Sequence, residues 1–173
     1  KIPYNLENNL INRLPFSLTP DQKKAIHEIK TDLFSPYPMN RLLQGDVGSG
    51  KTLVALMAML IAVDNGYQTA LMVPTEILAE QHHFNISRML ENLSVDIFLF
   101  TGSKSQQERK QLFNRINTGE PCIIIGTHTL IQESVRFKKL GLVIIDEQHR
   151  FGVRQRKALR DKGGNVKPHL LAM

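Results

Sequence analysis

Six short apolar segments, separated by helical patterns, constrain the fold of this chain more than any other feature of its sequence. The expected strands are 41–44, 69–73, 95–100, 122–125, 142–145 and 169–173. Helices are expected at 51–64, 75–93, 104–117 and 154–161, with a helical turn at 129–133. Strands that alternate with helices form a mostly parallel sheet with helices on both faces. The sequence therefore predicts an α/β fold whose ligands bind at the carboxyl ends of the strands.

The first 17 residues show no sustained periodicity, and we expect them to be a lead-in from a preceding domain. A helix is expected to begin directly afterwards, with Thr19 as N-cap, Pro20 in the first position and Gln22 closing a capping box. The length of 173 residues suits one α/β domain. We therefore expect residues 18–173 to form that domain.

Cysteine usage, apolar run length and charge limit the cellular compartment and the kind of partner that we expect for the protein. The single cysteine, Cys122, cannot form an internal disulfide and suits a reducing compartment, so we expect a cytoplasmic protein with a buried thiol. The longest apolar run, 53–63, is too short to span a membrane. Residues 136–173 hold ten basic and three acidic residues, whereas the rest of the chain is nearly neutral. This positive field suits a polyanion, although a solvated helix surface or a seam against another domain is the alternative.

Residues 45–52, GDVGSGKT, carry the motif that predicts nucleotide binding. They fit GxxxxGK[ST] and lie between an expected strand and an expected helix, the context that the motif requires. Glycines let successive backbone N–H groups point at phosphate oxygens, next to the positive end of the helix. We expect Lys51 to bridge the β- and γ-phosphates of ATP and Thr52 to bind Mg²⁺. The expected nucleotide contacts are Gly45, Asp46, Val47, Gly48, Ser49, Gly50, Lys51 and Thr52.

Two acidic residues, Asp146 and Glu147, follow the apolar segment 142–145. Acids at the end of a buried strand are the expected second half of a phosphate-binding site. We expect Asp146 to hold Mg²⁺ through its water shell and Glu147 to orient or deprotonate the attacking water. Together with Lys51, they are the predicted catalytic residues.

The residues around this acidic pair resemble one helicase family. DEQHRFG at 146–152 is similar to the DExH-type box of the RecG-type branch-migration helicases, whereas the transcription-repair coupling translocases usually have DEEQRFG and the primosomal helicases DEEH. FSLTPDQ at 16–22 and PTEILAEQH at 74–82 resemble other motifs of the RecG type. TGS at 101–103 and GTH at 126–128 match short nucleic-acid-facing motifs of the superfamily. The resemblance extends over nearly the whole chain.

This resemblance implies a RecA-like P-loop motor domain that uses ATP with Mg²⁺ and acts on branched or forked DNA, such as stalled forks and Holliday junctions. It also implies that Gln22 recognises the adenine edge and that Phe16 packs near the base, although a capping box also explains Gln22 and a hydrophobic staple also explains Phe16. Gln148 and His149 would couple the nucleotide to DNA and to a second motor domain. The implied DNA contacts are Pro74, Thr75, Thr101, Gly102, Thr127 and His128.

The family's second RecA-like domain, with its arginine finger, and its upstream wedge domain lie outside these residues, so we expect the first motor domain of a longer protein. Two alternatives stay open: a motor of the transcription-repair coupling or primosomal type, and a nucleotide-binding switch domain that does not move on DNA.

Two local expectations concern single side chains. Ser103 and Gln106 are expected to cap the helix at 104–117, and His82 and His83 are not expected to bind metal.

Overall fold

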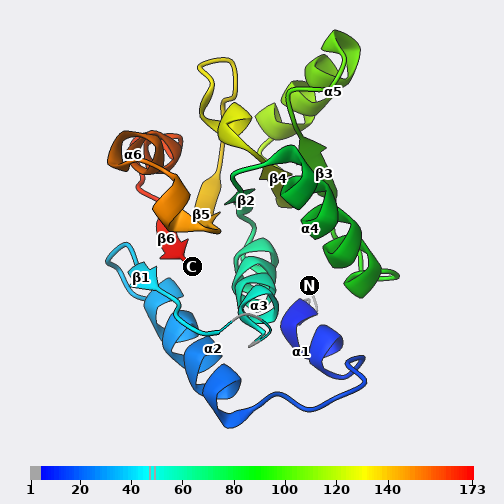
Figure 1. Ribbon diagram of the computed structural model, residues 1–173, viewed down its shortest axis with the longest axis vertical. Helices are drawn as coiled ribbons and strands as arrows, with labels where there is room; N and C mark the ends of the chain where they lie inside the picture. The colour runs from blue at the N-terminus through cyan, green and yellow to red at the C-terminus, as the bar shows by residue number, and fades with distance from the viewer. Residues whose placement is uncertain (1–4, 47, 49) are drawn as a thin grey trace.

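A six-stranded parallel sheet forms the centre of the computed structural model, which describes residues 5–46, 48 and 50–173. The strands run in the order β1-β6-β5-β2-β4-β3, and all the paired strands are parallel (Figure 1). Their bounds are β1 Asn40–Leu42, β2 Gln68–Met72, β3 Ile97–Phe100, β4 Cys122–Gly126, β5 Leu140–Ile145 and β6 His169–Ala172. The predicted α/β fold with a parallel sheet is confirmed.

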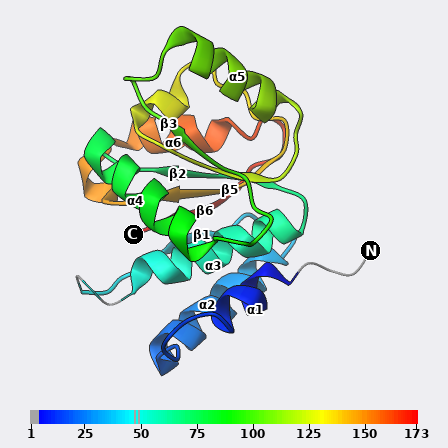
Figure 2. The ribbon, with the colours of Figure 1, turned by 90° about the vertical axis from the view of Figure 1, so that its right-hand side faces the viewer.

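Helices cover both faces of this sheet. The α-helices are α1 Leu6–Ile11, α2 Pro20–Leu33, α3 Lys51–Asp64, α4 Glu76–Met89, α5 Gln106–Asn117 and α6 Val153–Asp161, and the 3₁₀-helices are η1 His128–Ile131 and η2 Gln148–Arg150. Helices α1 to α4 pack on one face, and α5 and α6 pack on the other (Figure 2). Within the described part of the chain, no helix is both long enough and apolar enough to cross a membrane.

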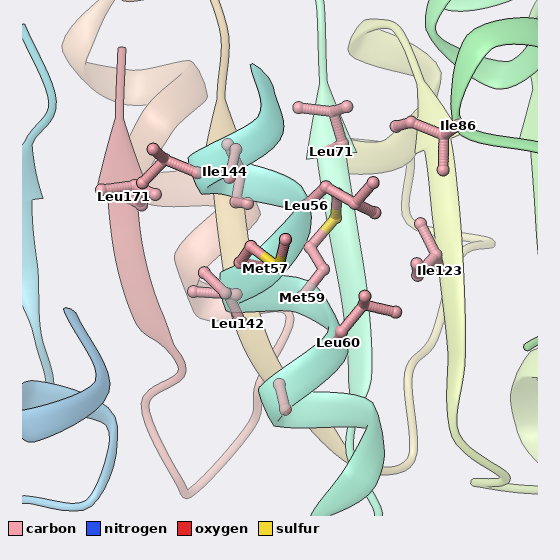
Figure 3. Packing of buried hydrophobic residues seen from close by; sticks show 14 of the residues in the cluster. Leu56, Met57, Met59, Leu60, Leu71, Ile86, Ile123, Leu142, Ile144 and Leu171 are labelled. Carbon is pink, nitrogen blue, oxygen red and sulfur yellow. The ribbon is translucent and has the colours of Figure 1, made fainter. Parts of the chain in front are cut away.

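Helix α3 is the most deeply buried element. Its residues from Leu53 to Val63 are all buried, because the connection from β1 to β2 passes beneath β6 and β5 and other helices cover its far side. In Figure 3, Leu56 and Leu60 of α3 lie on the side of Leu71 of β2 and Ile123 of β4, and Met57 lies on the side of Leu142 of β5. A helix enclosed in this way is expected to be apolar all round, as this one is.

The opposite face of the sheet has its own core, built from α5, α6 and the alternate side chains of the strands. Cys122 lies in this core, and burial raises the pKa of its thiol to about 12. The thiol is therefore a packing group, as the sequence predicted.

The amino-terminal segment differs from the sequence-based expectation, because residues 1–17 contain the helix α1. Leu6 and Leu10 are buried in the core beside α3, and the Leu6 N–H donates to Asp64 Oδ2 at 2.8 Å. A helix of six residues makes fewer than two turns. It is too short to produce a recognisable apolar period, which explains why the sequence analysis expects no helix there.

The capping of α5 also differs from the expectation. Ser105 is the N-cap, and its hydroxyl accepts the Glu108 N–H at 3.2 Å while the Glu108 carboxylate accepts the Ser105 N–H at 2.7 Å. Ser103 instead bonds through its hydroxyl to the Thr101 hydroxyl at 3.0 Å. Both registers fit the capping-box pattern, but only the Glu108 carboxylate also brings a negative charge to the positive amino end of the helix. The capping box predicted at Thr19, with Pro20 in the first position of α2, is confirmed.

Helix α4 ends at Met89, four residues before its predicted end, because the chain turns there with Asn92 at a φ of 66°. The other predicted elements are present. Their ends shift by one or two residues, as is usual for helix and strand termini.

Candidate nucleotide site at the carboxyl ends of the strands

Two glycines of the loop between β1 and α3 have backbone conformations that suit the predicted phosphate-binding motif. Gly48 and Gly50 have φ values of 82° and 83°, in the left-handed region that favours glycine. Gly50 is the N-cap of α3, so Lys51 and Thr52 occupy the first turn of the helix, where backbone N–H groups are available to an anion. Two predicted contacts, Val47 and Ser49, lie outside the described residues.

Gln22 lies against this loop. A Cβ placed on Gly50 would be 2.0 Å from Gln22 Nε2, so the amide of Gln22 occupies the space beside Gly50. The oxygen of the same amide, Gln22 Oε1, accepts the Thr19 N–H at 2.9 Å and completes the capping box of α2. The cap therefore orients the side chain toward the loop, and the two interpretations of Gln22 are compatible.

Asp146 follows β5 directly, and both its carboxylate oxygens have partners. Oδ1 accepts the Glu147 N–H at 2.9 Å, and Oδ2 lies 2.9 Å from His82 Nε2. Its backbone N–H donates to Met72 O of β2 at 3.0 Å, which keeps Asp146 in line with the sheet. Asp146 is thus held in a fixed place where the strand ends.

Glu147 has a left-handed backbone, with φ 55° and ψ 49°, which is uncommon for a residue other than glycine. Such a conformation costs about 1–3 kcal/mol and is concentrated at functional sites. It turns the chain out of the strand, and the exposed Glu147 carboxylate lies 3.3 Å from His149 Nε2. The roles predicted for the two adjacent acids stay predictions.

The short helix η2 connects this turn to neighbouring elements. The Gln148 N–H donates to Met173 O at 3.2 Å, and Gln148 Oε1 accepts from Arg156 of α6 at 3.1 Å. Gln148 and His149 share a hollow of about 360 Å³ with the phosphate-binding loop. Its lining residues are Leu42, Leu43, Gln44, Gly45, Asp46, Lys51, Gln148, His149 and Met173. Folding therefore brings together two motifs that are about a hundred residues apart in the sequence.

Phe16 does not line this hollow. It lines a separate hollow of about 630 Å³ between α1 and α2, where it is 56% exposed. The structure therefore does not bring Phe16 together with Lys51.

The residues expected to contact DNA all lie beyond the carboxyl ends of β2, β3 and β4, but several of their hydroxyls have partners within the protein. Thr75 accepts the Leu78 N–H, and the buried Thr101 and Thr127 hydroxyls pair with Ser103 and Thr129. The side chain of His128 is exposed, as is Gly102, and Pro74 is half-buried. If these turns contact DNA, as the sequence predicts, the contact falls chiefly to backbone groups and to His128.

His82 is the residue that sequence reasoning missed at this site. The sequence pattern indicated no partner for it, yet it contacts Asp146, which is 64 positions away. A signal was present, because His82 lies four residues after Leu78 and four before Ile86, on the apolar stripe of α4. Within the described residues there is no group of three or more His, Cys, Asp or Glu side chains arranged to hold a metal ion.

The model of the DEAD/DEAH box helicase family matches residues 19–171. The chain belongs to the DEAD/DEAH box helicase family. The match covers the loop at 45–52, the acidic pair and all three turns described above. Within this helicase family the fold is a RecA-like domain, as the sequence predicted.

Individual relatives place this DEAD/DEAH box helicase domain more narrowly. The ATP-dependent DNA helicase RecG of Aquifex aeolicus is 54% identical over 163 residues, which are 94% of this chain and 21% of that protein. RecG of Bacillus subtilis is 57% identical over 153 residues, 88% of this chain and 22% of that protein. The chain thus spans less than a quarter of the length of these relatives.

Solved structures agree with these relatives. A structure of RecG bound to a three-way DNA junction matches with a TM-score of 0.85 and 46% identity, over 99% of this chain and 23% of that one. A structure of Mss116p, at 22% identity, matches with a TM-score of 0.73 over 98% of this chain and 38% of that one, which shows a shared fold. The resemblance to RecG-type helicases found in the sequence is confirmed.

Proposed function

We propose that this chain is the first motor domain of a RecG-type ATP-dependent DNA helicase, which remodels branched DNA in recombination and repair. The observation that carries the proposal is the shared hollow, in which the phosphate-binding loop faces Gln148 and His149. The similarity to RecG, one structure of which is bound to a three-way DNA junction, supports branched DNA as the substrate. We place the protein in the cytoplasm, where such DNA is processed in bacteria.

The residues of the site fit ATP and Mg²⁺. The positive φ values of Gly48 and Gly50 give the turns from which backbone N–H groups would point at phosphate oxygens, and Lys51 supplies a positive charge at the amino end of α3. The Thr52 hydroxyl and the Asp146 carboxylate are the hard oxygen groups that Mg²⁺ prefers, with water completing its shell. Bound Mg²⁺ would supply charge neutralisation at the phosphates.

The chemical work of the chain then falls to Glu147, whose carboxylate is exposed beside this site. It would orient the attacking water or accept its proton. Gln148 and His149 would transmit the state of the nucleotide, with Gln148 tied to α6 through Arg156. A second RecA-like domain would close the hollow and contribute an arginine finger, and an upstream wedge domain would hold the junction.

The decisive experiment uses the intact protein with forked DNA and two variants. Lys51→Ala is expected to abolish Mg²⁺-ATP binding without unfolding the domain, because Lys51 lines an open hollow. Glu147→Gln keeps the shape of the side chain but removes the base, so it should retain binding and lower hydrolysis by roughly 10²-fold or more. Calorimetry and steady-state ATPase measurements distinguish these two effects.

Two outcomes would contradict the proposal. Unchanged ATP affinity in Lys51→Ala removes the phosphate-binding assignment, and near wild-type hydrolysis in Glu147→Gln assigns the base elsewhere. Nucleotide binding and hydrolysis that are indifferent to DNA would favour a switch domain. Translocation without a preference for branched DNA would favour a motor of the coupling or primosomal type.

A further inference from the structure

His82 of α4 makes a hydrogen bond to Asp146 that the proposed function does not use. His82 Nε2 lies 2.9 Å from Asp146 Oδ2. An ionised carboxylate can only accept, so the ring N–H of His82 donates. The side chains are 13% and 18% exposed, so water competes weakly with this bond.

The bond completes the fixation of the Asp146 carboxylate. Its other oxygen, Oδ1, already accepts the Glu147 N–H at 2.9 Å. With a donor on each oxygen, the carboxylate cannot turn about its Cβ–Cγ bond without losing one of them. The remaining lone pairs of Asp146 are not used by these two donors. His82 therefore sets the direction in which they point.

His82 is placed there by the buried stripe of α4. Ala79 and Ile86 are fully buried, and His82 lies three residues after the first and four before the second, on the same stripe. A polar ring on a buried stripe requires a partner. Because β2 and β5 are neighbours in the sheet, the helix that follows β2 passes beside the residue that follows β5.

The same helix begins at a turn expected to face DNA. Thr75 is the N-cap of α4 and directly follows Pro74. His82 is seven residues further on, about 10 Å along the helix axis at 1.5 Å per residue. An α-helix moves as a rigid body over two turns, so a displacement of its amino end also moves His82.

We propose that His82 is a positioning residue that orients Asp146 toward Mg²⁺ and links this carboxylate, through α4, to the DNA-facing turn at Pro74 and Thr75. The inference rests on the proposed function, because it requires both the metal and the DNA contact. Hydrogen-bond partners that orient a metal-binding side chain typically contribute roughly 10- to 100-fold to metal affinity. A DNA contact that moves α4 would change this contribution, and with it the affinity for Mg²⁺.

The test measures binding of a fluorescent ADP to the intact protein as Mg²⁺ is varied, without turnover. His82→Leu removes the donor and should raise the Mg²⁺ midpoint by roughly 10- to 100-fold, while ADP affinity in EDTA stays as in the wild type. His82→Gln places an amide N–H at a similar reach and should return the midpoint to within a few-fold. His82→Asn is too short to reach Asp146 and should behave like leucine.

His83→Leu is the matched control, because His83 is the next residue on α4 and bonds to the backbone of Ile97 in β3. It should leave the Mg²⁺ midpoint unchanged. In the wild type, forked DNA should shift this midpoint, and in His82→Leu the shift should disappear. Melting temperatures identify any variant that is unfolded, and the glutamine variant keeps the test valid if leucine is not tolerated.

A wild-type Mg²⁺ dependence in folded His82→Leu and His82→Asn would overturn the inference while leaving the proposed function in place. A glutamine variant as impaired as leucine would also overturn it, because the donor would then not be the property that matters. A wild-type protein whose ADP affinity does not respond to Mg²⁺ would instead overturn the proposed function itself.

Discussion

Gly50 is a residue at which a backbone requirement and a packing requirement coincide. Its φ of 83° strains any residue with a side chain, and Gln22 Nε2 fills the space that a Cβ would occupy. The two costs have different origins. The first belongs to the loop alone, and the second depends on the side chain of Gln22.

A double-mutant cycle separates these two costs. Gly50→Ala is expected to destabilise the domain by about 1–2 kcal/mol through the left-handed backbone, with a further loss from the clash with Gln22. Gln22→Ala in the same chain should recover the part due to the clash but not the backbone part. Chemical unfolding measures both. If the two changes are simply additive, Gln22 does not lie against the loop in solution.

His169, at the start of β6, couples the stability of the fold to pH. Its Nδ1 accepts the Met39 N–H at 2.8 Å, and burial lowers its pKa from 6.5. Protonation removes this acceptor. The unfolded chain thus binds the proton more readily than the folded one, so stability is complete above the unfolded pKa and declines as the pH falls below it.

The free energy of unfolding should therefore fall as the pH is lowered from about 7 toward about 5. His169→Asn, whose amide oxygen can accept the Met39 N–H, should flatten this dependence. Burial also lowers the pKa of His83, so this residue should contribute to the loss of stability at low pH in the same direction. His83→Asn is therefore compared with His169→Asn to separate the two contributions. Urea unfolding at several pH values provides the measurement, and an unaltered pH dependence in His169→Asn would assign the effect to other groups.

At the scale of elements, the amino terminus of α5 tests which of two similar patterns caps a helix. Ser105→Ala removes the hydroxyl that accepts the Glu108 N–H and should cost about 1 kcal/mol. Ser103→Ala removes only the bond to Thr101 and should cost less. Thermal unfolding of the two variants compares them directly. The reverse ranking would restore the cap expected at Ser103.

Patterns that lie within one stretch of chain were predictable. The start of α3 at Lys51, directly after the glycine-rich motif, and the capping box at Thr19 depend on neighbours fewer than ten residues away, and both are where the sequence predicts them. The contact between His82 and Asp146 depends on β2 lying beside β5 in the sheet. The local periodicity of a sequence does not predict the order of strands in a sheet, so this contact could not be predicted. The partners of the Thr101 and Thr127 hydroxyls within the protein could not be predicted either, because burial at the end of a strand depends on the packing of the whole sheet.

At the scale of the molecule, the charge is concentrated in residues 136–173, and the structure distinguishes the members of that group. Arg154 and Lys157 of α6 are exposed. Arg156 is half-buried and donates to Gln148, so its loss would also disturb η2. Arg154 and Lys157 are therefore the residues on which DNA binding by charge alone can be tested.

Changing both Arg154 and Lys157 to glutamine in the intact protein should flatten the dependence of DNA affinity on salt. Removing one phosphate contact lowers the slope of log affinity against log salt by about 0.9 for duplex DNA. The matched control changes Lys23 and Lys24, two exposed lysines of α2 on the other face, which removes the same charge. A slope that falls equally in both variants would show that only the net charge of the protein matters. An unchanged slope in the Arg154 and Lys157 variant would make the basic segment a seam between domains.

The place of β1 at the edge of the sheet determines when this strand can join the fold during synthesis. Its partner in the sheet is β6, and the bond from Met39 to His169 joins residues 130 positions apart. At ribosomal rates of roughly 5–20 residues per second, β1 waits about 7 to 26 s for that partner to be synthesised. The loop that follows β1 lacks its anchoring strand during this interval. If the loop binds a nucleotide as proposed, we expect a nascent chain to acquire this ability only after nearly all of the domain has been translated.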